Sequence, residues 1–426
     1  MTHFLKRFSA IYWPILFCLF FLLTGGGLAA QSLVVQVVFS GLKRTQPQAL
    51  LRLLELQEGM PFDYTTLQND LRRLGNFNGM VKADYQLDTL ANGLRIHYLL
   101  QEGVTQYPIA LLGGLKDNFW WEIGYQDENW QGRGNTLSAS LRQTDGRLGG
   151  SLRFGQRFWR NKNWGYALQL ERYASQEPLY FGAEQVDYRY SNHNLGLTWH
   201  YHFTPESRLE VGLTYFVEDY EKVNLEQVPG PAQRTEYKQL LRLAYTQAWS
   251  KYDLYQPEGG DFRASGEFVF QKNTIPFFLF RAILRQYRPL GRKGLLATRL
   301  SAGYSANKNS PFAPFVVDSR VNIRGAGNRV DRGTAMMVLN LEYRHLLLQQ
   351  RWLAVQAVVF NDVGTWRNPG GTISDVLQRE NLKCFAGLGL RFISDWARQA
   401  VLRIDYGYGL HPVGQRGIVL GLGQYF

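Results

Sequence analysis

Residues 209–215 read LEVGLTY, and the order of apolar and polar side chains in this stretch decides the fold. Leu209, Val211, Leu213 and Tyr215 alternate with glutamate, glycine and threonine. Successive side chains of a β-strand point to opposite faces, so a strand with this sequence has one apolar and one polar face. The stretch therefore predicts a strand that separates an apolar environment from a polar one.

The alternating pattern continues from Tyr107 to Phe426 in segments of about ten residues, which is the length of strands in outer-membrane barrels. Gly, Asn, Asp and Pro separate the segments. About sixteen segments are present, and single-chain bacterial barrels have an even number of strands. We therefore predict a membrane all-β fold over residues 106–426, a 16-stranded antiparallel outer-membrane β-barrel.

The composition favours a membrane barrel over a soluble β-protein. Aromatic residues make up 14% of the chain, and they are carried by one unbroken run of predicted hairpins. Soluble β-sandwiches and propellers, the alternative folds, rarely combine these features. The net charge of +12 comes from basic residues scattered through the alternating segments, so we expect no nucleic-acid partner.

Residues 1–30 have the features of a secretory signal peptide. Basic residues precede an apolar run over 11–23, and small residues lead to Ala30, near which cleavage is expected. The alternative is a membrane anchor, but the apolar run is short for a bilayer and a proline interrupts it. Cys18 lies in this leader, so Cys384 remains alone and we expect no disulfide in the mature chain.

Residues 31–105 differ from the rest of the chain, because helical periodicity appears between strand-like runs. Asp63 is a plausible N-cap for the second helix, and Gly75 ends it. The predicted elements are a strand, two helices and two strands, over residues 33–39, 46–56, 63–75, 80–87 and 93–100. The sequence therefore predicts a small domain with the order β-α-α-β-β.

Several motifs, in order along the chain, resemble those of one superfamily of outer-membrane proteins. These are the assembly and translocation barrels of the BamA, TamA and two-partner-secretion type, whose periplasmic modules are called POTRA domains. The resemblance implies one POTRA-like domain in the periplasm, over residues 31–105, and a barrel in the bacterial outer membrane. The matching stretches are LELQEGMPFDYTTLQNDLRRLGNF (54–77), GYQDENWQGRGNTL (124–137), YDLYQPEGGDF (252–262), IRG (323–325), FNDVG (360–364), GLGLRF (387–392) and IDYGYGL (404–410).

The resemblance implies a role for the triplet Ile323, Arg324 and Gly325. In the superfamily, the sixth extracellular loop folds back into the barrel, and its arginine meets an acidic residue on the inner wall. Carried over, Arg324 would pair with Asp362 of the FNDVG motif. A guanidinium can bind a carboxylate through two parallel hydrogen bonds, and such a pair would hold the loop against the wall.

Alternatives to this pairing remain open on the sequence. Asp405 and Asp318 are rival partners for the arginine, and the simplest alternative is an arginine in a solvated loop. The sequence also departs from the superfamily motif, because Ala326 stands where an aromatic residue is usual after Gly325.

The resemblance also implies a seam where the first barrel strand meets the last and can open sideways. Glycine weakens a strand and offers no side chain to hold register, and a free strand edge can pair with an incoming strand. Smooth curvature of the barrel is the alternative explanation for the glycines. The candidate seam residues are Ile109, Leu111, Gly113, Gly114, Gly421, Gly423 and Phe426.

The function implied by the resemblance is assembly or translocation of proteins at the outer membrane, by insertion or export through the seam. Expected partners are unfolded outer-membrane or secreted proteins, the surrounding outer-membrane lipids and lipopolysaccharide, and periplasmic or lipoprotein partners of the POTRA-like domain. The alternative is a barrel subunit or pore that acts as a scaffold in a larger complex.

An enzyme is not expected, because no serine, histidine and acid constellation stands out in the sequence. His200 and His202 share a strand face, which would suit a metal ion. Strand alternation alone explains their spacing, and neither a cysteine nor a third histidine lies near them in the sequence. We therefore predict neither a metal nor a cofactor.

Overall fold

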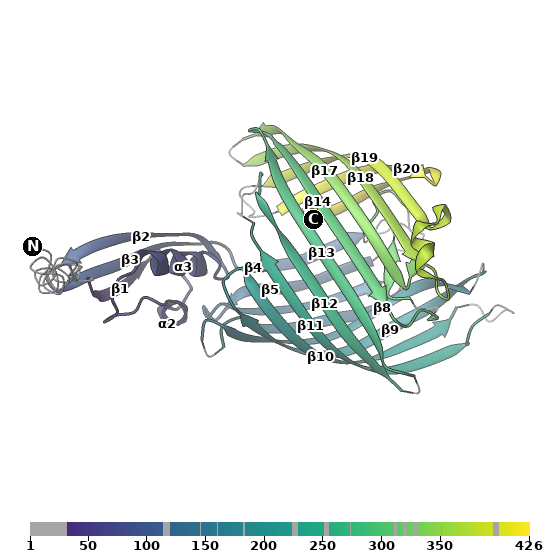
Figure 1. Ribbon diagram of the computed structural model, residues 1–426, viewed down its shortest axis with the longest axis horizontal. Coiled ribbons are helices and arrows are strands. Elements are labelled where there is room, and N and C mark those ends of the chain that lie inside the picture. The colour runs from purple at the N-terminus through teal and green to yellow at the C-terminus, as the bar shows by residue number, and fades with distance from the viewer. Residues whose placement is uncertain are drawn as a thin grey trace, which may run out of the picture.

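The structure is a computed structural model, and Figure 1 shows a small α/β domain at one end of a large curved sheet. The predicted leader, Gly114 and Asp318 lie outside the residues it describes. These described residues are 32–113, 120–144, 146–159, 161–181, 184–223, 229–250, 255–272, 274–310, 313–317, 322–326, 331–350, 352–394 and 400–426.

The small domain has the predicted order of elements. Strand β1 pairs in parallel with β3, and β3 pairs antiparallel with β2, so β1 and β2 form the two edges of its sheet. Asp63 caps the second helix by accepting a hydrogen bond from the Thr66 N–H at 2.7 Å. The elements are β1 (Val34–Ser40), α2 (Pro47–Leu51), α3 (Tyr64–Gly75), β2 (Met80–Leu90) and β3 (Gly93–Glu102).

The first helix is shorter than the sequence predicts. It ends at Leu51, although the apolar pattern continues to Leu56. The buried Asp70 carboxylate of α3 accepts the backbone N–H groups of Glu55 and Leu56, each at 2.9 Å. Because these amides bond to a side chain instead of a preceding carbonyl, the segment packs its leucines into the core without forming a helix. Among the described residues, no helix is long and apolar enough to cross a membrane.

The large sheet contains 16 antiparallel strands, which confirms the predicted fold class. Each strand pairs with its neighbours along the chain, except that β14 pairs directly with β17. The strands are β4 (Gln106–Gly113), β5 (Trp120–Trp130), β6 (Asn135–Thr144), β7 (Arg147–Gln156), β8 (Trp164–Phe181), β9 (Glu184–His202), β10 (Ser207–Lys222), β11 (Gln233–Ala248), β12 (Gly259–Gln271), β13 (Phe277–Leu290), β14 (Gly294–Ser305), β17 (Ala335–Gln349), β18 (Leu353–Arg367), β19 (Leu382–Ser394), β20 (Ala400–His411) and β21 (Val413–Leu422).

The register separates an apolar outer face from a polar inner face. Leu168, Leu197, Leu213 and Leu241 lie directly opposite one another on β8 to β11, and such residues face outward. The alternate residues carry the ion pairs, for example Arg263 with Glu210 at 3.1 Å. Residues directly opposite in an antiparallel ladder share a face, so one alternation sets both surfaces of the barrel.

The long loop between β14 and β17 carries a short hairpin of β15 (Phe315–Val317) and β16 (Asp331–Gly333). Phe315 and Val317 are buried, and Val317 packs in a cluster with Val338 of β17 and Phe385 of β19. The loop therefore folds into the barrel. The next loop, between β18 and β19, contains two 3₁₀ turns, η2 (Ile373–Leu377) and η3 (Arg379–Asn381).

The small domain is tied to the barrel by the turns at one end of β5 to β10. Phe158, which follows β7, packs against the hydrophobic core of the small domain. Nearby, Arg157 Nη1 donates to the Asn76 carbonyl at 2.6 Å, and Lys162 pairs with Glu55. A hydrogen bond from Lys162, aided by the charge of Arg73, lowers the pKa of Glu55 below its ordinary value of 4.5. We call this set of contacts the domain joint.

Candidate functional site

Arg324 is fully buried inside the barrel and meets Asp362 of β18. Its Nε donates to Asp362 Oδ2 at 2.8 Å and its Nη2 donates to Oδ1 at 2.8 Å, a two-pronged pair. The backbone N–H of Arg324 also donates to Oδ2, at 2.9 Å. Three charge-assisted hydrogen bonds therefore fix both the side chain and the backbone of the loop at one carboxylate.

The pair belongs to a larger buried cluster. Arg324 also pairs with Glu342 of β17, which in turn accepts from Arg344 Nε at 2.7 Å. Asp405 is 3.9 Å from Arg324 Nη1, but it accepts a hydrogen bond from Arg391 Nη1 at 2.7 Å. Asp405, the rival partner, therefore lies near Arg324 but pairs mainly with Arg391. We call these six residues, Arg324, Glu342, Arg344, Asp362, Arg391 and Asp405, the loop–wall cluster.

Aromatic rings cover both sides of the arginine. The guanidinium carbon of Arg324 lies 3.7 Å from the centre of the Phe360 ring and 4.1 Å from that of Tyr425. Stacking between a guanidinium and aromatic faces stabilises a charge that water cannot reach. Ala326, at the position of the usual motif aromatic, is 5% exposed and packs with Ile323 and its neighbours.

The loop backbone touches the bare backbone of the wall. Gly325 has a φ of +88°, a conformation that favours glycine. A Cβ on Gly325 would come within 2.7 Å of the Gly407 backbone on β20, and a Cβ on Gly407 would collide with the Arg324 carbonyl. Gly417 of β21 lies next to the same loop residue. The loop therefore lies against strands close to the β21 edge of the sheet.

The cluster balances its charges within a region closed to water. Three arginines face three carboxylates, and each of the six side chains is at most 2% exposed. Burying ions costs several kcal/mol each, so the net stabilisation from such a cluster is small while every partner is present. Removing one partner leaves an uncompensated buried charge and costs about 3–5 kcal/mol. The cost of separating the partners is therefore larger than the net stability that the whole cluster adds.

Four of the predicted seam residues lie in the two edge strands. Ile109, Leu111 and Gly113 lie in β4, and Gly421 lies in β21. Within the described parts of the chain, no ladder joins β4 to β21. The Arg403 side chain covers the inner face of Gly421, because a Cβ there would overlap its guanidinium.

Two of the predicted seam residues, Gly423 and Phe426, lie beyond the end of the closing strand. Strand β21 ends at Leu422, and Gly423 turns the chain with a φ of +81°. Tyr425 and Phe426 are each 8% exposed inside the barrel, where the Phe426 carbonyl accepts from Arg344 Nη2 at 2.9 Å. The alternating pattern continues past the turn, so the sequence pattern alone extends the strand too far.

Several residues of the site were missed by the sequence analysis. Glu342 and Arg344 alternate with apolar residues on β17, so the sequence pattern predicts that both side chains face into the barrel. Their meeting with Arg391 depends on the register between three strands. Tyr425 gave no signal, because its position follows from the turn at Gly423.

The two histidines predicted to share a face lie near the domain joint. The ring centroids of His200 and His202 are 5.3 Å apart, and His200 Nε2 lies 3.2 Å from the Arg157 carbonyl oxygen. In the described part of the chain, no group of three or more His, Cys, Asp or Glu residues is placed to hold a metal ion.

A family model described as the Omp85 superfamily domain matches residues 129–426. The chain belongs to the Omp85 superfamily. A second model, the POTRA model described as a surface antigen variable number repeat, matches residues 33–103 of this Omp85 chain. The barrel is therefore an outer-membrane barrel, and its POTRA domain lies in the periplasm. A search of curated proteins found no match.

Solved structures of Omp85 proteins share this fold. BamA from Haemophilus ducreyi lacking POTRA domains 1–3 has a TM-score of 0.59 at 16% identity, covering 91% of this chain and 83% of that one. CdiB from Acinetobacter baumannii has 0.62 at 13% identity, covering 92% and 74%. CdiB from Escherichia coli has 0.66 at 10% identity, covering 93% and 75%. At these identities the similarity concerns the fold.

Proposed function

We propose that this Omp85 chain inserts proteins into the outer membrane, or exports them across it, through an opening between β4 and β21. The observation that carries the proposal is that these strands form the two ends of the 16-stranded ladder. An edge strand has unpaired N–H and C=O groups, which can template an incoming strand by β-augmentation. A substrate strand would pair there and leave sideways into the membrane.

The loop–wall cluster would hold one side of this opening in place. Arg324 joins the loop to β17 and β18, and Gly325 lies against Gly407 on β20. These strands lead to β21, so the loop stiffens the side of the seam that ends with β21. The other side, beginning with β4, follows directly on the POTRA domain along the chain. Movement of the POTRA domain would therefore act on β4 first.

The POTRA domain would receive unfolded substrate or periplasmic partners. Strand β2 is an edge of its three-stranded sheet, and an extended chain can add to such an edge. Outer-membrane lipids and lipopolysaccharide would surround the barrel as its solvent. The names BamA and CdiB of structural relatives agree with assembly or secretion, but at low identity they support the fold alone.

A disulfide across the seam tests the proposal. Ala110 and Leu420 both face outward, since Ala110 lies opposite Ile123 and Leu420 lies opposite Ile404. In a Cys384→Ser background, Ala110→Cys would be combined in turn with Ile418→Cys and Leu420→Cys. Insertion of a barrel protein would be followed in proteoliposomes before and after oxidation.

We expect oxidation to stop insertion and reduction to restore it. The control pair is Ile123→Cys with Leu141→Cys, on strands that are already paired, which should crosslink without effect. Insertion that continues at the same rate with the seam crosslinked would exclude lateral opening. That result would favour the alternative function of a barrel subunit that acts as a scaffold.

A further inference from the structure

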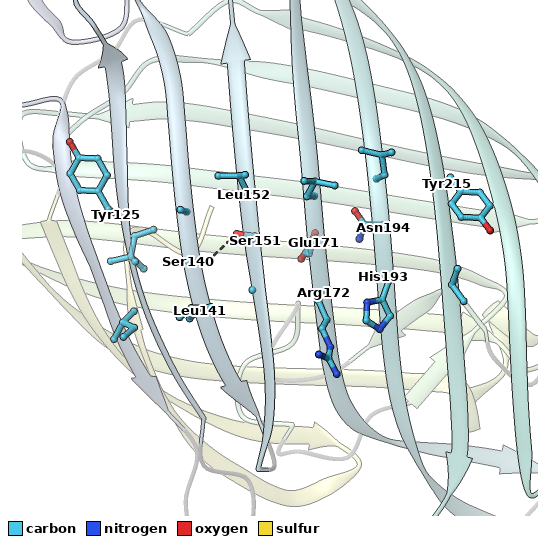
Figure 2. A pocket seen from close by; sticks show the side chains of 18 residues that line it. Tyr125, Ser140, Leu141, Ser151, Leu152, Glu171, Arg172, His193, Asn194 and Tyr215 are labelled. Carbon is cyan, nitrogen blue, oxygen red and sulfur yellow. Dashed lines mark hydrogen bonds between the residues drawn. The ribbon is translucent and has the colours of Figure 1, made fainter.

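Two basic side chains lie on the outward face of the barrel among leucines. Arg172 of β8 and His193 of β9 are directly opposite each other in the ladder. Arg172 faces the same way as Leu168 and Leu170, and both basic side chains are exposed. Neither side chain has a hydrogen bond or an ion pair with any residue that the structure describes. Figure 2 shows the two side chains on neighbouring strands, projecting in the same direction.

A hollow of about 990 Å³ lies beside this pair (Figure 2). The outward positions next to it are small, since Gly150 lies directly opposite Arg172 and Ala139 lies opposite Leu152. Small residues leave room next to the guanidinium. Apolar side chains that are 46–52% exposed line the rest of the hollow: Ile123, Leu141, Leu152, Leu170 and Leu195.

The pair lies at the edge of the apolar belt that is distant from the POTRA domain. Trp164 begins β8, beside the turn that holds Lys162 against the POTRA residue Glu55. Arg172 is eight residues further along β8, which is roughly 26 Å along a strand and about 20 Å along the membrane normal at the usual tilt. The apolar band of such barrels is about 25 Å tall, so the Arg172 backbone lies within about 5 Å of its outer edge. A long arginine side chain can extend over that distance to the headgroups of the outer leaflet.

We propose that Arg172 and His193 bind the phosphate of an outer-leaflet lipid whose acyl chains lie over the neighbouring hollow. The guanidinium offers parallel N–H donors that match phosphate oxygens, and the imidazole adds a further donor. The exposed leucines suit the acyl chains, and the gap above Gly150 admits the headgroup. The site rests on the outer-membrane location of the barrel and is independent of the proposed opening at the seam.

Binding of lipid to the purified full-length chain tests the site, with native mass spectrometry in detergent as the measurement. The lipid probe is diphosphorylated lipid A, and the same lipid with its phosphates removed shows what the phosphate contributes. Inorganic phosphate alone shows whether the acyl chains contribute. The variant is Arg172→Gln with His193→Gln.

A matched control is Arg288→Gln, because Arg288 of β13 also faces outward but lies near the turn to β14, at the end of the barrel that faces the periplasm. Arg172→Lys keeps the charge and loses the parallel donors. Heat-modified mobility in gel electrophoresis shows that each variant is folded, and the single variant Arg172→Gln replaces the double variant if the latter does not fold.

We expect the double variant to bind lipid A about tenfold more weakly, which corresponds to the loss of one charge-assisted phosphate contact. Arg288→Gln should bind like the original chain, Arg172→Lys should fall between, and dephosphorylated lipid A should bind both chains equally weakly. Equal binding of lipid A by the original chain and the double variant would overturn the proposal. So would binding of inorganic phosphate as tight as that of lipid A.

Discussion

The two halves of the barrel are built from the same alternating strands, yet their inner faces differ. In the half from β17 to β21, the loop–wall cluster buries three arginines and three carboxylates beyond the reach of water. In the half from β5 to β12, inward ion pairs stay partly exposed, as in Arg142 with Glu122, whose side chains are 32% and 13% exposed. The difference shows that one half is fixed from within by a loop, while the other is held from outside by the POTRA domain.

Substitution of Arg324 should give the largest difference in stability between the two halves. Arg324→Ala leaves the buried Asp362 without its arginine, while Glu342 keeps Arg344, so we expect a loss of about 3–5 kcal/mol in the free energy of unfolding. The measurement is denaturant unfolding in detergent, together with protease cleavage in the loop. Arg142→Ala, in the other half, should cost about 1 kcal/mol or less, because its pair is partly solvated. Equal losses for the two variants would contradict the contrast between the halves.

Adding one methyl group at the contact between loop and wall should give the next largest effect. A Cβ at Gly407 would overlap the Arg324 carbonyl, so Gly407→Ala should cost about 1–3 kcal/mol and expose the loop to protease. Gly155→Ala on β7 is the matched control, since its Cβ would find its nearest atoms at 3.8 and 3.9 Å. A loop that stays as protected in Gly407→Ala as in Gly155→Ala would show that the close contact is not needed.

The ring of Tyr425 should contribute less to the free energy of unfolding. Its face lies 4.1 Å from Arg324 and 4.9 Å from both Arg299 and Arg403, so Tyr425→Leu should cost about 1 kcal/mol in unfolding free energy. Tyr425→Phe keeps the ring and should be close to neutral. If Tyr425→Phe lost as much stability as Tyr425→Leu, the hydroxyl group and not the stacking would be responsible.

The domain joint should show the smallest effect, and it should depend on pH. The pKa of Glu55 is lowered in the folded chain, so its contribution is fully present above about pH 4.5 and is lost as pH falls through the folded-state value. Because Glu55 and Lys162 are partly exposed, we expect less than about 1 kcal/mol. Energy transfer between dyes on the POTRA domain and on the barrel would report the loosening. In Lys162→Gln the change on acidification should be smaller, and an unchanged response would assign the pH dependence to other groups.

The strand pattern and the short motifs made much of the fold and part of the site predictable. Arg324 lies in the IRG motif and Asp362 lies in the FNDVG motif. Both residues could therefore be predicted as partners without knowledge of the strand register. Glu342 lies in none of the matching stretches, and the motif that contains Arg391 implied no partner for it. Many inward charges alternate along these strands, and only the register of β17, β18 and β19 decides which of them meet.

Backbone conformation limited the rest of the prediction. Ile418, Leu420 and Leu422 alternate as a strand does, and Phe426 continues the same spacing. The positive φ of Gly423 ends the strand, and nothing in the alternation indicates where that turn occurs. The helix predicted for residues 46–56 of the POTRA domain is too long for a related reason. The side chain of Asp70, on another helix, accepts the backbone N–H groups that would continue it.

The chain turn at Gly423 also bears on permeation. Tyr425 and Phe426 pack against Ala297 of β14 from the end of β21, so this segment and the loop together cover part of the inner face along β14 to β21. The ion pairs on the inner face of β5 to β13 stay partly exposed. Ions that cross the barrel would therefore pass along β5 to β13, and their flow would sense the charges of that wall while the buried arginines beside the loop stayed electrically silent.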